Sequence, residues 1–344
     1  MKALSVVAPH HVEVIEQPIP DMRDDEALVK VAAATICHTD HYILSGNHPF
    51  ATYPVTPGHE FSGVVQAVGS KVTYLTPGTR VAVQTLLPCN HCRFCWRGEI
   101  NLCENVQELG SLRPGGYEEY VVVPAYALHP IADHLSLEEA AMTEPSANAH
   151  AVVRRAEIQT GDTVAVIGPG PIGLLVMQYA MLKNPSRLIL IGLPNDAPRL
   201  EAGKQLGATD IIGLPADQAI KRVYELTDGR GVDRVLQCAG AVPATHLALA
   251  IAGLGSTVAI EGVTGTSDTI PVSPDDILQK AITLRGVRGW TVADFAAALQ
   301  INQSGRINLK ALLTHRFTLD QHAAAFEMTG KYTDGVIKAA FIFA

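Results

Sequence analysis

The first 130 residues carry short apolar runs separated by turn residues. The segments ALVKVAAATI, FSGVVQAVG, TRVAVQ and YEEYVVV are typical of strands, and Pro77-Gly78 is typical of a turn between two of them. We therefore predict an irregular all-β region. Between Ser136 and Arg155 the pattern becomes helical, because a serine precedes two glutamates and an alanine-rich run.

From Gly161 onward the pattern changes to apolar runs that alternate with helical stretches. The runs are TVAVIG, RLILIGL, VDRVLQCAG and STVAIEGV. Strands that alternate with helices predict a parallel, doubly wound sheet. The alternation ends near Arg285, and two helices and a final apolar strand, VIKAAFIFA, follow. A chain of 344 residues exceeds the usual size of a single core, so we expect two domains.

Composition and charge narrow the class of protein. Hydrophobic residues make up 47% and charged residues 17%, which suits a compact globular enzyme, and the formal net charge of -8 disfavours nucleic acid as a partner. The N-terminal segment lacks the apolar core of a signal peptide. The apolar segment 163–182 is long enough for a membrane span, but Gly168, Pro169 and Gly170 interrupt it. We expect a cytoplasmic protein with no membrane partner.

Four of the six cysteines fall within residues 89–103, with the spacing C-x2-C-x2-C-x7-C. Clustered cysteines in a long chain without a signal peptide indicate metal binding rather than disulfides. Four thiolates can close a tetrahedral site on zinc, which makes a structural zinc the prediction. The alternatives are four unrelated loop cysteines or a nucleic-acid-binding zinc ribbon, and the acidic charge disfavours the ribbon. The predicted ligands are Cys89, Cys92, Cys95 and Cys103.

A glycine-rich turn, G-x-G-x-x-G, follows the predicted strand TVAVI and opens an apolar helix. In that context the motif predicts a dinucleotide site, with the cofactor's pyrophosphate at the helix N-terminus. A glycine-rich turn without a ligand is the alternative. The residues expected to contact the cofactor are Gly168, Gly170, Pro171, Ile172 and Gly173.

The acidic residue that binds the adenosine ribose is missing from its usual place, about 20 residues after the glycines. The second strand of this region ends at Gly192, and Asp196 follows in a longer loop, where it could bind the ribose hydroxyls. Arg199 could instead meet a 2′-phosphate, although a helix-surface role is the more ordinary one. We expect NAD as the cofactor, with NADP possible.

A second cysteine context, Ile36-Cys37-His38-Thr39-Asp40, is followed by Gly58-His59-Glu60. Together with the cysteine cluster and the glycine turn, these runs resemble the zinc-containing medium-chain alcohol dehydrogenases, and above all their sorbitol, threonine and polyol dehydrogenases. The resemblance covers essentially the whole chain. It implies a GroES-like catalytic domain, residues 1–150 completed by 286–344, and a Rossmann domain, residues 151–285, with the active site in the cleft where they meet.

The resemblance also implies a catalytic zinc bound by Cys37 and His59. In polyol-type members the third protein ligand is a glutamate, and Glu144 in the run Met142-Thr143-Glu144-Pro145 matches it. A capping or salt-bridged carboxylate is the alternative for Glu144. Glu60 resembles a glutamate that can replace the metal-bound water, so we count it among both the catalytic and the metal-binding residues.

The resemblance further implies hydride transfer between a secondary alcohol and the nicotinamide, with zinc acting as a Lewis acid. Thr39 resembles the relay hydroxyl of the family. Many members place a histidine five residues after the zinc-binding cysteine, where this chain has Tyr42 with His41 beside it. We expect Thr39 and Tyr42 to carry the proton, and the histidines nearby could also be simple surface residues.

The substrate expected from these residues is a polyol, a sugar acid or a similar polyhydroxylated secondary alcohol. A carboxylate ligand makes a harder zinc site, which suits oxygen-rich ligands. The segment around Cys37 also offers polar groups: Thr39, His41, Tyr42, Asn47 and His48. Simple alcohols and threonine-like amino alcohols are the alternative substrates, and family members commonly form dimers or tetramers.

Two rival functions, a zinc-free quinone or enoyl reductase and a non-enzymatic cofactor-binding protein, predict loss of the zinc ligands, which are present.

Overall fold

The computed structural model describes residues 1–264 and 269–344, and the chain divides into two compact units. Unit 1 comprises Met1–Ala147 and Trp290–Ala344, and unit 2 comprises Asn148–Gly289. Unit 1 therefore contains both ends of the chain, and unit 2 is a single continuous segment between them.

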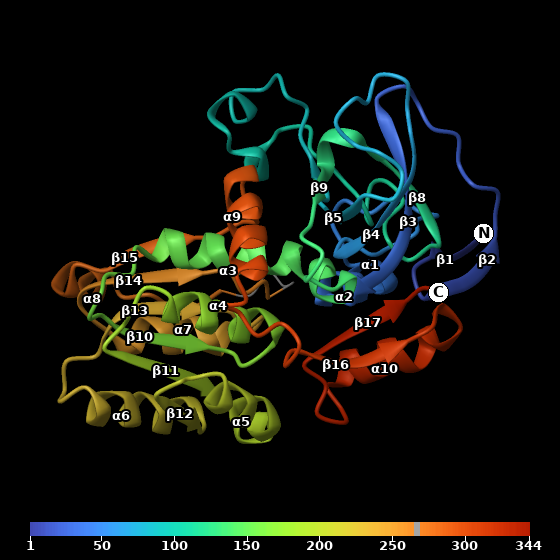
Figure 1. Ribbon diagram of the computed structural model, residues 1–344. Coiled ribbons are helices and arrows are strands. Elements are labelled where there is room, and N and C mark those ends of the chain that lie inside the picture. Colours follow the sequence, from blue (N-terminus) through green and yellow to red (C-terminus); the bar gives the residue numbers. More distant parts are fainter. Residues whose placement is uncertain (265–268) are drawn as a thin grey trace. The chain divides into compact units, whose positions relative to one another are not determined.

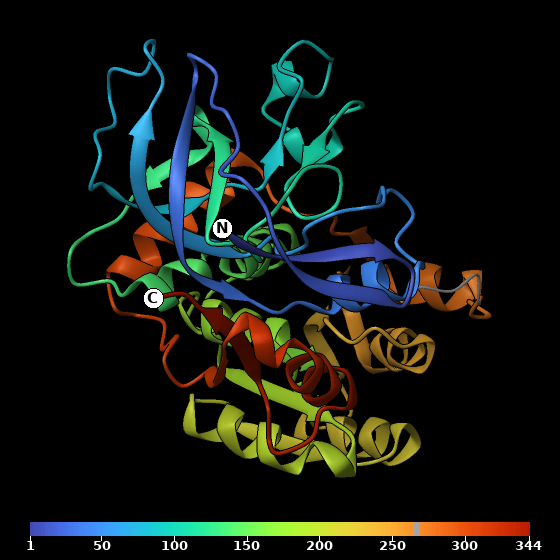
Figure 2. The same cartoon turned by 90° about the vertical axis from the view of Figure 1, so that its right-hand side faces the viewer.

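Unit 1 is built around an open sheet whose strand order is β16-β17-β3-β4-β5-β9, and β8 also pairs with β3. β3 (Glu26–Thr35) runs antiparallel to β4 (Phe61–Val68) on one side and to β17 (Lys338–Ile342) on the other. The last strand of the chain therefore lies beside one of the first (Figure 2). The other strands of unit 1 are β1 (Lys2–Ala8), β2 (His11–Glu16), β5 (Arg80–Val83), β6 (Leu86–Leu87), β7 (Gln107–Glu108), β8 (Tyr120–Pro124), β9 (Leu128–Pro130) and β16 (Leu313–Phe317).

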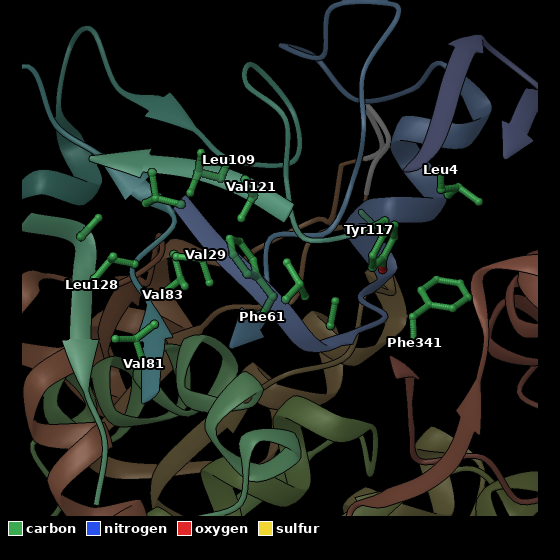
Figure 3. Packing of buried hydrophobic residues seen from close by; sticks show 14 of the residues in the cluster. Leu4, Val29, Phe61, Val81, Val83, Leu109, Tyr117, Val121, Leu128 and Phe341 are labelled. Carbon is green, nitrogen blue, oxygen red and sulfur yellow. The ribbon is translucent and has the colours of Figure 1, made fainter. Parts of the chain in front are cut away.

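Alternating burial along β3 explains why this segment is a sheet strand. From residue 27 to residue 33 every second residue is buried, and the residues between them, Leu28, Lys30 and Ala32, are only partly covered. The side chains of Val29, Phe61 and Val83 belong to one apolar cluster, shown in Figure 3. Tyr117 and Phe341 belong to the same cluster and meet edge to face, with ring centroids 4.8 Å apart. The first and last parts of the chain thus share one core.

The helices of unit 1 include the predicted helical region around Ser136, whose first helix packs on the sheet strands β3, β4 and β5. That region forms two helices rather than one, α2 (Leu137–Ala141) and α3 (Thr143–Ala156), and α3 continues into unit 2. Ser136 caps α2, because its hydroxyl accepts from the Glu139 N–H at 3.2 Å while the Glu139 carboxylate accepts from the Ser136 N–H at 3.1 Å. The remaining helices are α1 (His38–Ser45), α9 (Val292–Gln303) and α10 (His322–Lys331).

Unit 2 is a six-stranded parallel sheet with the order β12-β11-β10-β13-β14-β15. This is the 3-2-1-4-5-6 order of doubly wound dinucleotide-binding folds. Helices lie on both faces of the sheet, with α6 packed against α7 (Figure 1). The strands are β10 (Thr163–Ile167), β11 (Arg187–Gly192), β12 (Asp210–Gly213), β13 (Val232–Gln237), β14 (Ala252–Ile260) and β15 (Thr283–Gly286). The helices are α4 (Pro171–Met181), α5 (Ala197–Gln205), α6 (Ala216–Leu226), α7 (Val242–Ile251) and α8 (Pro274–Lys280).

The predicted fold class, a β-rich unit combined with a doubly wound parallel sheet, is confirmed. The central strands β10 and β11 are almost fully buried, as expected for parallel strands covered on both faces, whereas the edge strand β15 is largely exposed. Within the two described ranges, no helix combines the length and the apolar character needed to cross a bilayer.

Glu118 is a buried carboxyl group outside the predicted sites, just before β8. It is 1% exposed, and its Oε2 accepts from the Gln17 side-chain amide at 2.9 Å, whereas its Oε1 has no hydrogen-bond partner among the described residues. Burial raises the pKa of Glu118 to about 8, although the Gln17 hydrogen bond acts to lower it. The folded protein therefore holds a proton on Glu118 that the unfolded chain releases at a lower pH.

We predict that Glu118→Gln removes part of the loss of stability at high pH. The folded pKa lies above the unfolded value, so the stability contributed by Glu118 is complete in acid and is lost as the pH rises through about 8. The variant and the parent should have equal free energies of unfolding at about pH 5. At about pH 9 the free energy of unfolding of the variant should be higher by on the order of 1–3 kcal/mol. Urea unfolding at both pH values measures this, and an equal difference at the two would contradict it.

Candidate zinc and cofactor sites

The four cysteines of residues 89–103 come together in unit 1. All four Sγ atoms lie within 4.8 Å of one another. The Sγ of Cys95 lies 3.5 Å from that of Cys92 and 3.9 Å from that of Cys89, and the Cys89 N–H donates to the Cys103 Sγ at 3.3 Å. Two short 3₁₀ turns, Cys95–Arg97 and Ile100–Leu102, fold the segment back on itself. The spacing seen in the sequence is therefore sufficient to gather the sulfurs locally.

These sulfurs have the geometry of a zinc site. Four sulfurs arranged tetrahedrally at about 2.3 Å from a zinc ion lie about 3.8 Å apart. Backbone N–H groups lower the pKa of Cys92 to about 6, whereas burial and the neighbouring thiols raise the pKa of Cys95 to about 12. Four thiolates this close repel one another unless a cation holds them, so the donor set fits a metal ion with no open coordination position.

A second ligand cluster forms where β3 ends and β4 begins. Cys37 is the N-cap of α1, just after β3, and His59 and Glu60 directly precede β4. The antiparallel register pairs Ala34 with Phe61, so the end of one strand faces the start of the other. One ligand atom from each of Cys37, His59 and Glu60 lies within 4.8 Å of the others. The structure thus brings together three of the four residues predicted for the catalytic zinc.

Asp40 lies behind this cluster, fully buried on the inner face of α1. Its Oδ2 accepts from the Tyr117 hydroxyl at 2.6 Å and from the Cys37 N–H at 2.8 Å. Its Oδ1 lies 3.6 Å from the His59 Nδ1 and has no hydrogen bond within the part of the chain that the structure describes. A metal bound to the other ring nitrogen of His59 would direct the Nδ1–H toward this carboxylate, which is the usual environment of a metal-binding histidine.

Glu60 is held by the C-terminal strand. The Lys338 Nζ, at the start of β17, lies 2.6 Å from Oε2 and 2.9 Å from Oε1, and the Thr35 hydroxyl also donates to Oε2. Both Glu60 and Lys338 are buried. Glu60 therefore belongs to the ligand group by position while a lysine from the far end of the chain neutralises its charge.

Glu144 lies in the first turn of α3 and is 8% exposed. Its Oε1 accepts from the Trp290 indole N–H at 2.6 Å. Burial raises the pKa of Glu144 to about 7, the Glu60 charge adds to the increase, and His59 acts to lower it. Glu144 is thus close enough for the charges of His59 and Glu60 to shift its pKa, but it is outside the group whose ligand atoms lie within 4.8 Å. Its role as third ligand stays a prediction.

The charges of this second cluster fit a divalent cation. Three buried carboxylates and one thiol lie near a single buried lysine: Asp40, Glu60, Glu144, Cys37 and Lys338. Burial would lower the pKa of His59, but the charges of Cys37 and Asp40 outweigh burial and raise it well above its ordinary value. Buried charge of this kind is stable only when it is paired or bound to a metal.

The predicted proton-relay residues lie on α1 beside this cluster. The Thr39 hydroxyl lies 3.7 Å from the Cys37 Sγ. Tyr42 lines a hollow of about 470 Å³, and the ring of His38 meets the Tyr42 ring edge to face at 5.0 Å. The other polar side chains in the hollow are His10, His41, Ser45 and Asn47. Three of the five polar residues expected to form a polar site therefore line one hollow, with Thr39 and His48 outside it.

In unit 2 the glycine-rich turn connects β10 to α4 as predicted. Gly168 has a φ of +99°, and a side chain there would meet Ala239, so glycine is needed for the turn. A Cβ on Gly173 would collide with the Gly168 carbonyl oxygen, so the helix packs closely on the turn. A Cβ on Gly170 would meet nothing within 4 Å, which leaves room for a phosphate. α4 begins at Pro171, with Ile172 in its first turn.

Asp196 and Arg199, expected near the cofactor ribose, form an ion pair with each other. The Asp196 Oδ2 also accepts from the Leu193 N–H at 2.8 Å. A Cβ on Gly192 would lie 3.1 Å from the Asp196 Oδ2 and 2.8 Å from Pro169 of the glycine turn. Asp196 therefore lies at the carboxyl end of β11, next to the turn, although it comes four residues after the strand.

Two sets of metal-binding side chains and a dinucleotide-binding sheet in one chain define a class, the metal-dependent oxidoreductases that use a nicotinamide cofactor. The family comparisons identify the family within that class. The alcohol dehydrogenase GroES-like domain family matches residues 23–133, and the zinc-binding dehydrogenase family matches residues 171–304. The chain belongs to the zinc-containing medium-chain alcohol dehydrogenases, and it is a zinc-dependent oxidoreductase of that family.

Individual relatives match over nearly the whole chain. The chain is 34% identical to D-arabitol-phosphate dehydrogenase of Enterococcus avium, over 95% of this chain and 94% of the relative. It is 36% identical to sorbitol dehydrogenase of Halalkalibacterium halodurans, over 92% of each. A zinc-binding dehydrogenase structure from Sinorhizobium meliloti, bound to NADP, matches with a TM-score of 0.93 at 31% identity, over 99% of each chain.

Several residues around the second cluster carried no assigned role in the sequence. Asp40 stands three residues after Cys37, a position that meets the N-cap in a helix, so the spacing could have indicated it. Lys338 lies 278 residues from its partner Glu60, and Trp290 lies 146 residues from its partner Glu144, so no local pattern connects them. Those two contacts needed the tertiary structure.

We predict that replacing one cysteine in each ligand set removes one zinc per chain with different consequences. Cys92→Ser should lower the thermal stability and the folded yield, because the loop 89–103 loses the ion that holds it. Cys37→Ser should keep the fold and cofactor binding but lower turnover by orders of magnitude. Elemental analysis, thermal unfolding and cofactor titration measure this. Unchanged zinc content in both variants would contradict it.

Proposed function

We propose that this dehydrogenase interconverts a polyol, a sugar acid or a similar polyhydroxylated secondary alcohol with its ketone, using NAD. The observation that carries the proposal is the buried Glu144 carboxylate, which lies near the Cys37, His59 and Glu60 group and offers it a second carboxylate. Oxygen donors make a harder metal site, which suits substrates rich in hydroxyl groups. The relatives that act on D-arabitol phosphate and sorbitol support the same substrate class.

The proposed catalytic zinc ligands are Cys37, His59 and Glu144, with Glu60 next to them as an alternative carboxylate ligand. When bound, zinc supplies a Lewis acid that makes the substrate hydroxyl more acidic, and the nicotinamide supplies the hydride acceptor. Asp40 orients the His59 ring through the Nδ1 side. Lys338 keeps the Glu60 charge balanced while Glu60 remains near the ligand position.

The chain's own groups must move the proton of the substrate hydroxyl to water. Thr39 is the proposed first group, because its hydroxyl lies beside the Cys37 sulfur. Tyr42 is the proposed second group, since it lies one helical turn further along α1 and lines the 470 Å³ hollow. His41, in the same hollow, bonds through its Nε2 to the Thr329 hydroxyl at 3.1 Å and fixes this side of α1 against α10.

We propose that unit 2 binds the cofactor through the glycine turn, with Asp196 next to the adenosine ribose and Arg199 as its partner. A carboxylate at this position would repel a 2′-phosphate and hydrogen-bond a 2′-hydroxyl, which favours NAD. The domain assignment is part of this proposal: residues 1–150 and 286–344 as the catalytic domain, and 151–285 as the cofactor domain.

We also propose a cytoplasmic homo-oligomer, a dimer or tetramer. All six cysteines are free thiols, the state in which they can bind zinc and the state that the cytoplasm maintains. β15 is an edge strand of the unit 2 sheet, and the exposed side chains of Leu254, Leu278 and Leu284 belong to this strand and the neighbouring β14 and α8. An edge strand with exposed apolar neighbours favours pairing with a second copy.

We predict that polyols and aldonates of four to six carbons are better substrates than ethanol or 2-butanol, by about a hundredfold or more in kcat/KM for the best of them. A site built to bind hydroxyl groups rejects analogues that lack them, because its polar groups are then left without partners. Steady-state rates with free polyols, phosphorylated polyols, aldonates, threonine and simple alcohols measure this. If simple alcohols or threonine give a kcat/KM equal to or above that of every polyol tested, the polyol proposal is wrong. The substrate class is then the one that gives the higher value.

We predict that Asp196→Ala shifts the cofactor preference toward NADP by about tenfold or more. The variant removes the carboxylate that repels the 2′-phosphate and with it the ion pair of that carboxylate with Arg199. The ratio of kcat/KM for NAD and NADP measures it. Asp217→Ala is the matched control, since Asp217 is an exposed acid on α6 of the same unit. A parent that prefers NADP, or an equal shift in both variants, would contradict the assignment.

A further inference from the structure

Trp290 lies at the point where the chain re-enters unit 1, immediately before α9. It is 1% exposed and is one of the largest fully buried side chains of the protein. A buried indole N–H needs an acceptor, and that of Trp290 donates to the Glu144 Oε1 at 2.6 Å. The acceptor is thus the carboxylate proposed as the third ligand of the catalytic zinc.

Ring packing and a helix cap on the next residue hold the indole in place. The Trp290 ring packs on Phe295 with centroids 5.1 Å apart, and Phe295 packs on His129 at 4.8 Å. The next residue, Thr291, caps α9: its hydroxyl accepts from the Asp294 N–H at 3.2 Å, and the Asp294 carboxylate accepts from the Thr291 N–H at 3.0 Å. The donor therefore lies directly before the capped start of α9.

The same segment is tied to α3 at a second point. The Asn302 side chain, near the end of α9, donates to the Ser146 hydroxyl at 3.1 Å, two residues after Glu144. Both residues of that contact are buried. The segment formed by Trp290 and α9 thus holds the first turn of α3 at two side chains, the Ser146 hydroxyl through Asn302 and the Glu144 carboxylate through Trp290.

We propose that Trp290 is a positioning residue of the catalytic zinc site, whose indole N–H fixes the Glu144 carboxylate in the orientation from which it binds the metal. The inference rests on the proposed function in taking Glu144 as a zinc ligand. A carboxylate bound through one oxygen can rotate about its last bonds, and a short hydrogen bond to that group removes this freedom. Groups that orient a metal ligand in this way change the metal affinity by about tenfold to a hundredfold when they are replaced.

The test uses the full-length enzyme depleted of its catalytic zinc and refilled with zinc or cobalt(II). Trp290→Phe keeps an aromatic ring against Phe295 and removes the N–H. We expect metal affinity at the catalytic site, measured by chelator competition and by the absorption of the cobalt–Cys37 thiolate, to weaken by about tenfold to a hundredfold. The content of the four-cysteine site should not change. Affinity equal to that of the parent would overturn the proposal.

Two controls separate the hydrogen bond from packing. Trp96→Phe replaces the other tryptophan, which is 77% exposed in the four-cysteine loop, and should leave the catalytic affinity unchanged. Phe295→Leu disturbs the packing of the indole but keeps its N–H, so it should lower thermal stability with a smaller effect on affinity than Trp290→Phe. Equal loss of affinity in Phe295→Leu and Trp290→Phe would overturn the role of the N–H.

A double-mutant cycle tests whether Trp290 acts through Glu144. Glu144→Ala should weaken metal binding by itself, and adding Trp290→Phe to it should cause no further loss. If Trp290→Phe lowers the metal affinity by the same factor with and without Glu144→Ala, the proposal is overturned. Failure of the proposed function is distinguishable, because then the parent enzyme itself would bind no second metal or oxidise no alcohol.

Fluorescence gives a readout independent of turnover. In Trp96→Phe, Trp290 is the remaining tryptophan, since the sequence contains two. Its emission should change as zinc is added to the depleted enzyme, with a midpoint equal to that of the cobalt–thiolate signal. Emission that follows the four-cysteine site, or that does not respond to zinc, would overturn the proposal.

Discussion

The buried negative charge at the junction of β3 and β4 is the constraint on which unit 1 depends. Asp40, Glu60 and Glu144 are all buried beside the Cys37 thiol, and Lys338 is the buried lysine that faces them. Uncompensated charge in a protein interior is costly, because water no longer screens or solvates it. Lys338 pairs with Glu60, and a cation bound at Cys37 and His59 would offset the remaining charge, so metal binding adds to the stability of this unit.

Each buried carboxylate has its own donor, and each donor comes from a different part of the chain. Asp40 accepts from Tyr117, which precedes β8. Glu60 accepts from Lys338 of β17, and Glu144 accepts from Trp290 before α9. Because these segments follow one another at intervals along the chain, the site is complete only when the C-terminal segment has joined the sheet. This explains why unit 1 contains both ends of the chain.

The two metal-ligand sets differ in how they are assembled. The four cysteines lie in one short segment, so local turns suffice to bring them together, and the spacing in the sequence predicted the cluster. Cys37 and His59 are joined only by the β3–β4 register, and the contribution of Glu144 depends on where α3 begins. A local set can be recognised from spacing alone, whereas a set gathered by a sheet cannot. For the second set, resemblance to the family supplied what the spacing lacked.

The sequence by itself determined the β-rich and doubly wound halves, the four-cysteine cluster and the glycine turn, because each rests on residues close together in the chain. The structure supplies the reasons for glycine in this turn, which are the positive φ of Gly168 and the close packing of Gly173 on the Gly168 carbonyl. Tertiary structure alone decided that α2 and α3 are separate helices, that Asp196 pairs with Arg199, and that Lys338 and Trp290 hold the two glutamates. Those contacts join residues far apart in sequence or depend on a side chain's final direction, and neither is encoded in a local pattern.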